Sequence, residues 1–335
     1  MLKNFNLLLG IICMLFATTC DESKYENLEE YFCHIDAEID MFADTSFFSE
    51  ITCMQYYQGS LYALDAGRRD VAVFPEDYAA VSFAGQPGQG PQDLTSPNVF
   101  YVSNDTISVL DDGIGLKQFY RNKFVNLLKA KLSSNCRFTC VSNKYYIPAF
   151  NENYLFAVLK NNGSENDVVY GGHTVKFNSV KETIFRNLRK LLSDSLYLYA
   201  VSDNIPNIEK YDLTTYELIE TLDLSDVPII KKYLRHIASE SLPPDTYIKF
   251  MGDAYLSDNF LYVLCASPSP DYKTNTILKI GLYPEMKPVA MIYLPDKIYS
   301  AFCVSPKYIH AFNSRKATIE RFEIPMNDHA ENLQE

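Results

Sequence analysis

The fold is decided by a hairpin pattern that is clearest in LYALDAGRRDVAVF, residues 61–74. Two apolar runs of strand length, 61–64 and 71–74, enclose a short polar segment that contains Asp65 and Gly67. Runs of this composition on either side of a turn predict two antiparallel β-strands. The segment between them predicts a tight reversal, because Asp caps neighbouring backbone amides and Gly adopts dihedral angles that other residues avoid.

The pattern recurs along the chain. The first runs of the six pairs are 61–64, 107–110, 145–147, 196–201, 261–265 and 308–311. The second runs are 71–74, 116–120, 155–159, 208–213, 277–282 and 319–324. A third strand pattern follows at 80–84, 125–128, 217–224 and 289–294. A repeat of about fifty residues indicates an array of equivalent structural units.

Several of these runs are apolar on both faces, which is typical of strands covered on both sides. A sheet that lies between two similar sheets meets this condition. Six units of three or four antiparallel strands therefore predict an all-β fold, a six-bladed β-propeller with short helical insertions. A β-sandwich is the alternative, but its strands would alternate more cleanly and would show no hairpin repeat of this period.

The ends of the folded region follow from the same pattern. After Ile324 too few residues remain to form an outer strand for the sixth unit. Residues 31–35 with Ile39 have strand composition and precede the first unit, so we expect them to pair with the last unit and close the ring. The predicted propeller spans 31–326, and 327–335 is a polar C-terminal tail.

Two segments depart from the strand pattern. Apolar residues recur at helical spacing in 180–192 and again in 227–237, which predicts two helices on one rim of the ring. Basic residues occupy their remaining faces, and in an acidic chain these could attract an anion. The alternative is that they are solvated surfaces of ordinary helices. The residues of this candidate basic rim are Arg189, Lys190, Arg235 and His236.

The first twenty residues have the layout of a signal peptide. Lys3 precedes a ten-residue apolar run, 7–16, which is too short to span a membrane and ends in Ala17-Thr18-Thr19-Cys20. This ending resembles a lipobox, which predicts a signal peptide at 1–19 and a lipid on Cys20; the alternative is an ordinary signal peptide with an incidental Cys. The acidic segment 20–30 is predicted to be a flexible tether.

A family resemblance rests on GQPGQGPQDL, residues 85–94, followed by NDTISVLD, residues 104–111. These segments resemble the six-bladed β-propeller lipoproteins of the Bacteroides type, within the TolB-like and NHL-like propellers. Gly88, Gly90 and Pro91 match the shared loop, while 92–94 replace its usual Gly, Glu and aromatic residue. The resemblance implies a cell-envelope lipoprotein with a ligand or partner at the propeller mouth, and we expect it at the outer membrane, periplasmic or surface-exposed. It implies no activity.

Few residues of the sequence indicate a catalytic site. The sequence contains no Gly-x-Ser-x-Gly elbow, Cys-x-x-Cys pair or P-loop, and its five His have no metal-ligand spacing. Polar residues at the ends of predicted inner strands could converge on the tunnel. The alternative is that they cap turns. These candidate tunnel-mouth residues are Asp65, Asp111, Asp203 and Asn313.

The cysteines also show no functional pattern. Six of the eight remain after the predicted signal peptide and lipid site, and their spacing shows no disulfide framework. Cys136 and Cys140 would lie roughly 13 Å apart on an extended strand, beyond disulfide reach. We therefore expect these six cysteines to act as small, buried, apolar side chains.

Charge and composition limit the function. A formal charge of −12 opposes binding to nucleic acid, whose affinity depends on Lys and Arg. We expect a monomer, attached to the membrane through its lipid, without a cofactor. The favoured function is a non-enzymatic binding or scaffold module for a protein, peptide or glycan. The alternative is a hydrolase or lyase with a tunnel-mouth site, lactonase-like or metal-assisted.

Overall fold

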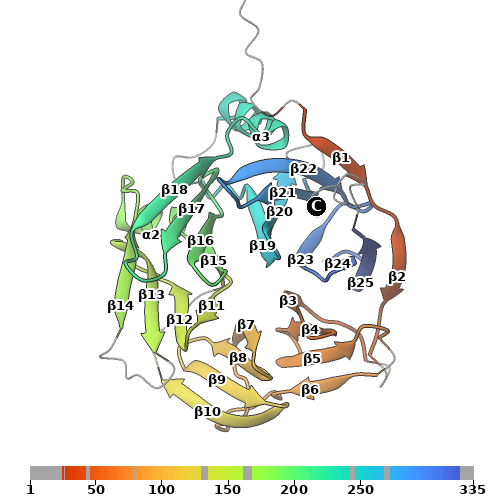
Figure 1. Ribbon diagram of the computed structural model, residues 1–335. Helices are drawn as coiled ribbons and strands as arrows, with labels where there is room; N and C mark the ends of the chain where they lie inside the picture. The colour runs from red at the N-terminus through yellow and green to blue at the C-terminus, as the bar shows by residue number, and fades with distance from the viewer. Residues whose placement is uncertain are drawn as a thin grey trace, which may run out of the picture.

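The chain folds into a ring of six β-sheets around a common axis, as the computed structural model shows (Figure 1). The structure describes residues 25, 27–42, 46–78, 80–129, 135–160, 168–241, 246–267 and 272–324. The prediction of an all-β, six-bladed propeller is confirmed. Cys20, the predicted signal peptide and the tail 327–335 lie outside the described residues.

Each blade begins with its innermost strand and ends at the outside of the ring. The first blade contains β3 (Ile51–Tyr57), β4 (Ser60–Asp65), β5 (Asp70–Pro75) and β6 (Ser82–Ala84). The second contains β7 (Pro97–Ser103), β8 (Thr106–Asp111), β9 (Gly115–Tyr120) and β10 (Lys123–Lys129). The third contains β11 (Thr139–Val141), β12 (Lys144–Pro148), β13 (Tyr154–Lys160) and β14 (Val169–His173).

The remaining three blades follow the same order. The fourth contains β15 (Arg189–Ser193), β16 (Tyr197–Ser202), β17 (Asn207–Asp212) and β18 (Leu218–Asp223). The fifth contains β19 (Met251–Ser257), β20 (Phe260–Ser267), β21 (Lys273–Gly281) and β22 (Lys287–Tyr293). The sixth contains β23 (Tyr299–Val304), β24 (Tyr308–Asn313) and β25 (Thr318–Glu323) from the end of the chain.

The innermost strands form the wall of the central tunnel. Each contacts the innermost strand of the next blade, and the contact between β23 and β3 completes the circle. The hairpins expected from the sequence are the second and third strands of the blades, such as β4 and β5. Their first members were interpreted as inner strands, and this was wrong because a further strand precedes each of them.

The N-terminal segment closes the ring at two blades. Strand β2 (Ile35–Ile39) pairs antiparallel with β25, so the expected closure of the last blade occurs. Strand β1 (Glu29–Phe32) instead adds a parallel fifth strand to β22 of the fifth blade, which the sequence did not indicate. Because β1 begins at Glu29 and Tyr25 is buried, the folded region begins before the predicted end of the tether at residue 30.

The helical insertions agree with the predictions in part. Helix α3 (Pro228–Ser239) forms where expected, and Pro228 occupies its first turn. Helix α2 (Val180–Arg186) is capped by Ser179 and ends six residues before the predicted boundary at residue 192. After α2 the chain enters β15, which pairs with β16, so the helix prediction for 188–192 was wrong.

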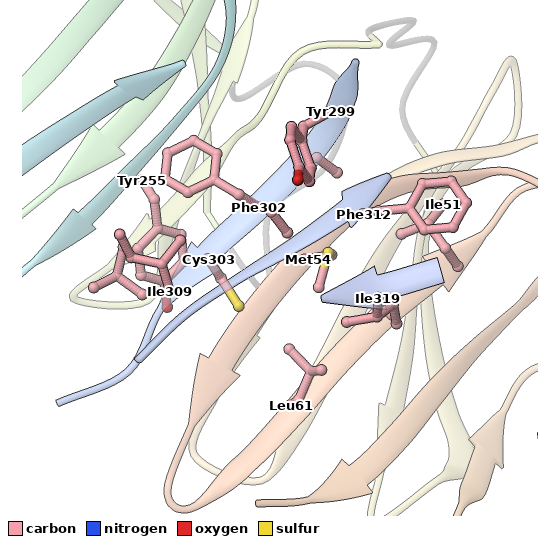
Figure 2. Close-up of a cluster of buried hydrophobic side chains, with 14 of the residues drawn as sticks. Ile51, Met54, Leu61, Tyr255, Tyr299, Phe302, Cys303, Ile309, Phe312 and Ile319 are labelled. Atoms are coloured by element: carbon pink, nitrogen blue, oxygen red, sulfur yellow. The ribbon is translucent and has the colours of Figure 1, made fainter. Parts of the chain in front are cut away.

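The apolar core lies between the blades. Figure 2 shows the part between the sixth and first blades, where Phe302, Ile309 and Phe312 lie near Met54 and Leu61. All five are at most 2% exposed. Burying one such side chain contributes about 1.5–3 kcal/mol, so inter-blade contacts of this kind stabilise the ring.

The loop at residues 85–94 connects the first blade to the second. Its Asp93 carboxylate accepts hydrogen bonds from the Gly90 amide at 2.7 Å and from the Gln86 side chain at 2.8 Å. Leu94 is fully buried. The loop thus joins the last strand of one blade to the first strand of the next, and its polar residues organise the connection itself.

Candidate functional site

The ring axis is crossed by a buried ion pair. Arg137, which lies just before β11, donates from Nε and Nη2 to the two carboxylate oxygens of Asp253 at 2.6 and 2.7 Å. It also donates to the carbonyl of Met54 on β3 at 2.8 Å and to that of Phe302 on β23 at 2.7 Å. The third and sixth blades are opposite in a six-membered ring, so this side chain reaches across the tunnel.

Both partners of the ion pair form further hydrogen bonds. Asp253 also accepts from the backbone amide of Phe302 at 3.0 Å. Burial alone would lower the pKa of Arg137, but the carboxylate of Asp253 outweighs it and raises that pKa. A paired and hydrogen-bonded charge is the form in which an ion is tolerated in an interior. We therefore interpret this pair as a connection between blades.

The first two candidate tunnel-mouth residues cap turns. Asp65 is fully buried at the end of β4 and accepts from the amides of Ser49 and Glu50, at 2.7 and 3.0 Å, just before β3 begins. Asp111 is fully buried at the end of β8 and accepts from the amide of Ser96 at 2.6 Å. Both are at the ends of second strands, and their oxygens hold the backbone that leads into the innermost strand.

Asn313 has a similar role in the sixth blade. It is fully buried at the end of β24, and its carbonyl oxygen accepts from the amides of Arg315 and Lys316, at 3.2 Å each. Its amide nitrogen donates to Glu320 at 3.0 Å. Asp203, just after β16, is paired with the Lys190 ammonium, as Asp111 is with Lys117 at 2.8 Å, but it differs from the other three because it lines the cavity described below.

The candidate basic rim is divided by the structure. Arg189 and Lys190 lie in the innermost strand β15 and are at most 5% exposed, so they were wrongly placed on a helix face. Arg189 donates to Glu209 at 3.2 Å and to Ser202 at 3.0 Å. Arg235 and His236 are exposed on α3. These four residues do not form one surface.

A cavity of about 550 Å³ opens beside the ring axis, where β11, β15 and β19 begin. We call it the face pocket. The third, fourth and fifth blades supply its walls, together with α2 and the segment before β19. The lining side chains used below are Cys136, Phe185, Lys190, Asp203, Tyr247 and Lys249. Its volume lies within the usual range of small-ligand sites, about 300–1,000 Å³.

Charged residues form the floor of the face pocket. The ammonium of Lys190 contacts a carboxylate oxygen of Asp203 and lies 3.4 Å from the carbonyl of Met251. The hydroxyl of Tyr247 donates to the other oxygen of Asp203 at 3.4 Å. The charge of Lys190 is therefore balanced within the protein, and Asp203 has no oxygen left without a donor.

Lys249 lies in the same wall and is half-buried. It forms no hydrogen bond or ion pair with the part of the chain that the structure describes. Burial and the neighbouring charge of Lys190 lower the pKa of Lys249. Neither Lys249 nor Arg137 could be identified from the sequence, because neither belongs to a local motif.

Two other cavities differ from the face pocket in their lining. One of about 700 Å³ lies between the outer strands β18 and β22, and its described lining is rich in acidic side chains, including Glu220, Asp223 and Glu285. A small one of about 90 Å³ lies beside Arg137. Of the three, only the face pocket combines a cation without a described partner and exposed aromatic rings.

The described residues show neither a metal-binding cluster nor a disulfide. No three His, Cys, Asp or Glu side chains among them are grouped in a way that could hold a metal ion. The six described cysteines are free thiols, of which Cys140 is half-buried and the others are buried. Burial raises the pKa of Cys136, in the wall of the face pocket, to about 12. None of the described helices is long and apolar enough to cross a membrane.

Comparisons with known proteins identify the fold. No protein-family model matches the sequence, and no curated protein matches it. Among solved structures, a protein of Bacteroides fragilis described as a candidate exported protein aligns at 13% identity over 89% of this chain and 99% of its own, with a TM-score of 0.58.

Two further β-propellers show a similar relationship. The Swd1 β-propeller domain of Myceliophteria thermophila aligns at 9% identity over 88% of this chain and 100% of its own, with a TM-score of 0.53. The WD40 propeller domain of Doa1 aligns at 11% identity over 88% of this chain and 97% of its own, also with a TM-score of 0.53. At these identities the chain is similar to all three in its fold, which is a β-propeller.

Proposed function

We propose that this chain is a cell-envelope lipoprotein whose propeller is a binding module, and that the face pocket holds part of its ligand. The observation that supports this most is the half-buried ammonium of Lys249, which has no described partner in a cavity of about 550 Å³. Binding pockets typically combine apolar walls with a few polar groups of this kind.

The tunnel-mouth residues favour binding over hydrolysis or elimination. A catalytic carboxylate must have an oxygen free to reach the substrate. The oxygens of Asp65 and Asp111 instead accept from backbone amides, and Asn313 is engaged in the same way. We therefore favour a binding or scaffold role, for a protein, peptide or glycan, over the enzymatic alternative.

The lipid anchor is a separate part of the proposal. It is supported by the apolar run 7–16, the lipobox-like sequence that ends at Cys20 and the resemblance of residues 85–94 to propeller lipoproteins of the Bacteroides type. Metabolic labelling with a lipid analogue should mark the wild-type chain and not the Cys20→Ser variant. Equal labelling of both would contradict the anchor. Protease treatment of intact cells then separates surface from periplasmic display.

A pocket-filling variant tests the binding role. Gly252 lines the face pocket, and a Cβ added there would meet its nearest neighbour, the carbonyl oxygen of Leu264, at 3.6 Å, an ordinary contact. The Gly252→Phe variant should therefore fold and fill the cavity. Arrays of envelope glycans, peptides and soluble proteins are probed with both chains. We expect at least one ligand to bind wild type and not Gly252→Phe.

Gly252→Ala is the matched control, because it adds a Cβ without filling the pocket. It should bind that ligand as wild type does, and both variants should keep the wild-type melting temperature within a few degrees. A ligand that binds wild type and Gly252→Phe equally well would place the binding site elsewhere on the molecule.

A further inference from the structure

The charges that line the face pocket leave an unbalanced positive charge. Two of its cations are neutralised by neighbours, since Arg186 lies 3.1 Å from Glu182 and Lys190 contacts Asp203. The other two, Lys181 and Lys249, have no ion pair among the described residues. Of these two, Lys249 is half-buried and therefore partly dehydrated, whereas Lys181 is exposed. Lys249 is the group to which an anionic ligand would be drawn.

The environment of Lys249 strengthens its attraction for an anion. The residue is half-buried, and the Coulomb attraction between two opposite charges increases as the water between them is removed. Lys190 carries the same charge nearby, and it lowers the pKa of Lys249, as burial does. The negative charge of Asp203 acts in the opposite direction but does not outweigh burial and Lys190, so a bound anion would add opposite charge that Lys249 still lacks.

Aromatic rings stand at the same opening. Phe185 on α2 is 38% exposed and Tyr247 is 45% exposed, although both line the pocket. Phe150 packs edge-on against Phe185, with ring centroids 5.4 Å apart, and holds that ring in place. The hydroxyl of Tyr247 is held by Asp203. Two fixed and partly exposed rings offer flat apolar surface beside a cation.

We propose that the face pocket binds a sugar acid, with its carboxylate on the Lys249 ammonium and its ring against the face of Phe185 or Tyr247. This inference rests on the proposed binding function and names the ligand class of the same pocket. A carboxylate matches a single ammonium in charge. The apolar face of a pyranose ring matches an aromatic ring in shape, and its hydroxyl groups remain toward water at the opening.

The geometry favours a sugar acid over two other anions. Bidentate recognition of phosphate uses the planar fork of an Arg, and the one Arg of the pocket wall, Arg186, is paired with Glu182, so phosphate would be held here by lysine as a point charge alone. Peptides are typically held along a sheet edge or by backbone nests at a terminus. The half-buried cation here without an ion pair among the described residues is Lys249, in a pocket that Phe185 and Tyr247 also line.

Calorimetric titration of the full mature chain tests the ligand class. The probes are trisaccharides of galacturonate and of glucuronate, their neutral galactose and glucose counterparts, inorganic phosphate and a peptide of five glutamates. The variants are Lys249→Met, which keeps most of the apolar stem and removes the charge, and Lys123→Met. Lys123 is exposed on the outer strand β10 of the second blade, so it is a matched control.

We expect at least one uronate to bind wild type and Lys123→Met with equal affinity. The Lys249→Met variant should bind it at least tenfold more weakly, and so should wild type with the neutral counterpart. A similar melting temperature for both variants excludes unfolding as the reason. If neutral and acidic sugars bind equally and Gly252→Phe blocks both, the carboxylate inference is wrong while the binding site stands.

Two other outcomes would also overturn the inference. Binding of phosphate or of the acidic peptide, without binding of either uronate, would assign the pocket to another class of anion. Failure of every probe to bind the correctly folded wild-type chain would mean that Lys249 does not select a sugar acid. The array experiment with Gly252→Phe would still test the binding function independently.

Discussion

Arg137 and Asp253 are joined by two hydrogen bonds, of 2.6 and 2.7 Å, that connect the third blade to the fifth beside the ring axis. The same guanidinium reaches the carbonyls of β3 and β23, so one side chain links four of the six blades. Among the described residues the innermost strands β3 and β19 are also joined across the ring, by two hydrogen bonds between Tyr56 and Tyr255, but that pair joins two blades, whereas Arg137 links four.

Removal of one partner of this pair should destabilise the propeller strongly. The Arg137→Met variant leaves the Asp253 carboxylate buried without its cation, and losses of about 3–5 kcal/mol are typical of such changes. We expect a comparable loss for Asp253→Asn and a smaller one than their sum for the double variant. Urea denaturation measures all three. Additive losses would mean that the two side chains do not act as a pair.

Removal of the N-terminal strands should weaken the ring at its closure. Deletion of residues 27–40 removes β1 and β2 and exposes the edges of β22 and β25. It also removes the ion pair between Asp36 and Arg321, whose atoms lie 2.6 Å apart. We expect a melting temperature lower by at least 10 °C. A peptide of residues 27–40 should restore part of it, whereas an unchanged melt would show that the ring closes without these strands.

His310 should make the folded state sensitive to acid. It is fully buried, and burial together with the charge of Arg321 lowers its pKa to about 3. The unfolded chain binds a proton near the ordinary pKa of 6.5, whereas the folded chain does not until much lower pH. The contribution of His310 to the free energy of unfolding is therefore fully present above about pH 7 and declines as the pH falls toward 3.

The size of the effect follows from the pKa difference. At pH 4.5 the contribution of His310 should be reduced by about 2–3 kcal/mol relative to pH 7. The His310→Gln variant, which can keep a hydrogen bond to Tyr78, should lose that much less stability over the same range. Because Asp and Glu titrate equally in both chains, the difference between the two urea curves isolates His310. Parallel losses would refute the prediction.

Gly85 should not tolerate a side chain. Its φ of +80° lies in the left-handed region, and a Cβ would come within 2.6 Å of the buried Leu94 side chain. Backbone strain of this kind costs on the order of 1–3 kcal/mol. We expect Gly85→Ala to lower the unfolding free energy by that amount, while Gly252→Ala, which has no such strain or clash, should change it little. A neutral Gly85→Ala would contradict this view of the loop.

The second and third strands of each blade could be predicted because their pattern is local. In the first blade, β4 and β5 are apolar, and the turn between them contains Asp65 and Gly67. Innermost strands lack that signal. Strand β15 begins with Arg189 and Lys190, whose charges are balanced by Glu209 and Asp203 in neighbouring strands and loops. Because such charges typically face water, the segment was interpreted as the end of a helix.

The candidate site could be predicted only in part. Asp203 and Lys190 were both named from the sequence and both line the face pocket, but as members of separate groups. Lys249 was not named, because one lysine between Ile248 and Phe250 is an ordinary strand pattern. Its significance arises from Phe185 and Asp203, more than forty residues away in sequence, and such proximity is fixed by the ring.

The place of β2 beside β25 has a consequence for the order of events during synthesis. Asp36 and Arg321 are separated by 285 positions in the sequence, so their strands cannot meet until nearly all of the polypeptide has been made. Contacts this distant slow folding, since a long loop must close before they form. Until β24 and β25 have been synthesised, the backbone hydrogen-bonding groups of β2 therefore have no native partner and can pair with other strands. We expect a chaperone that shields it to raise the yield.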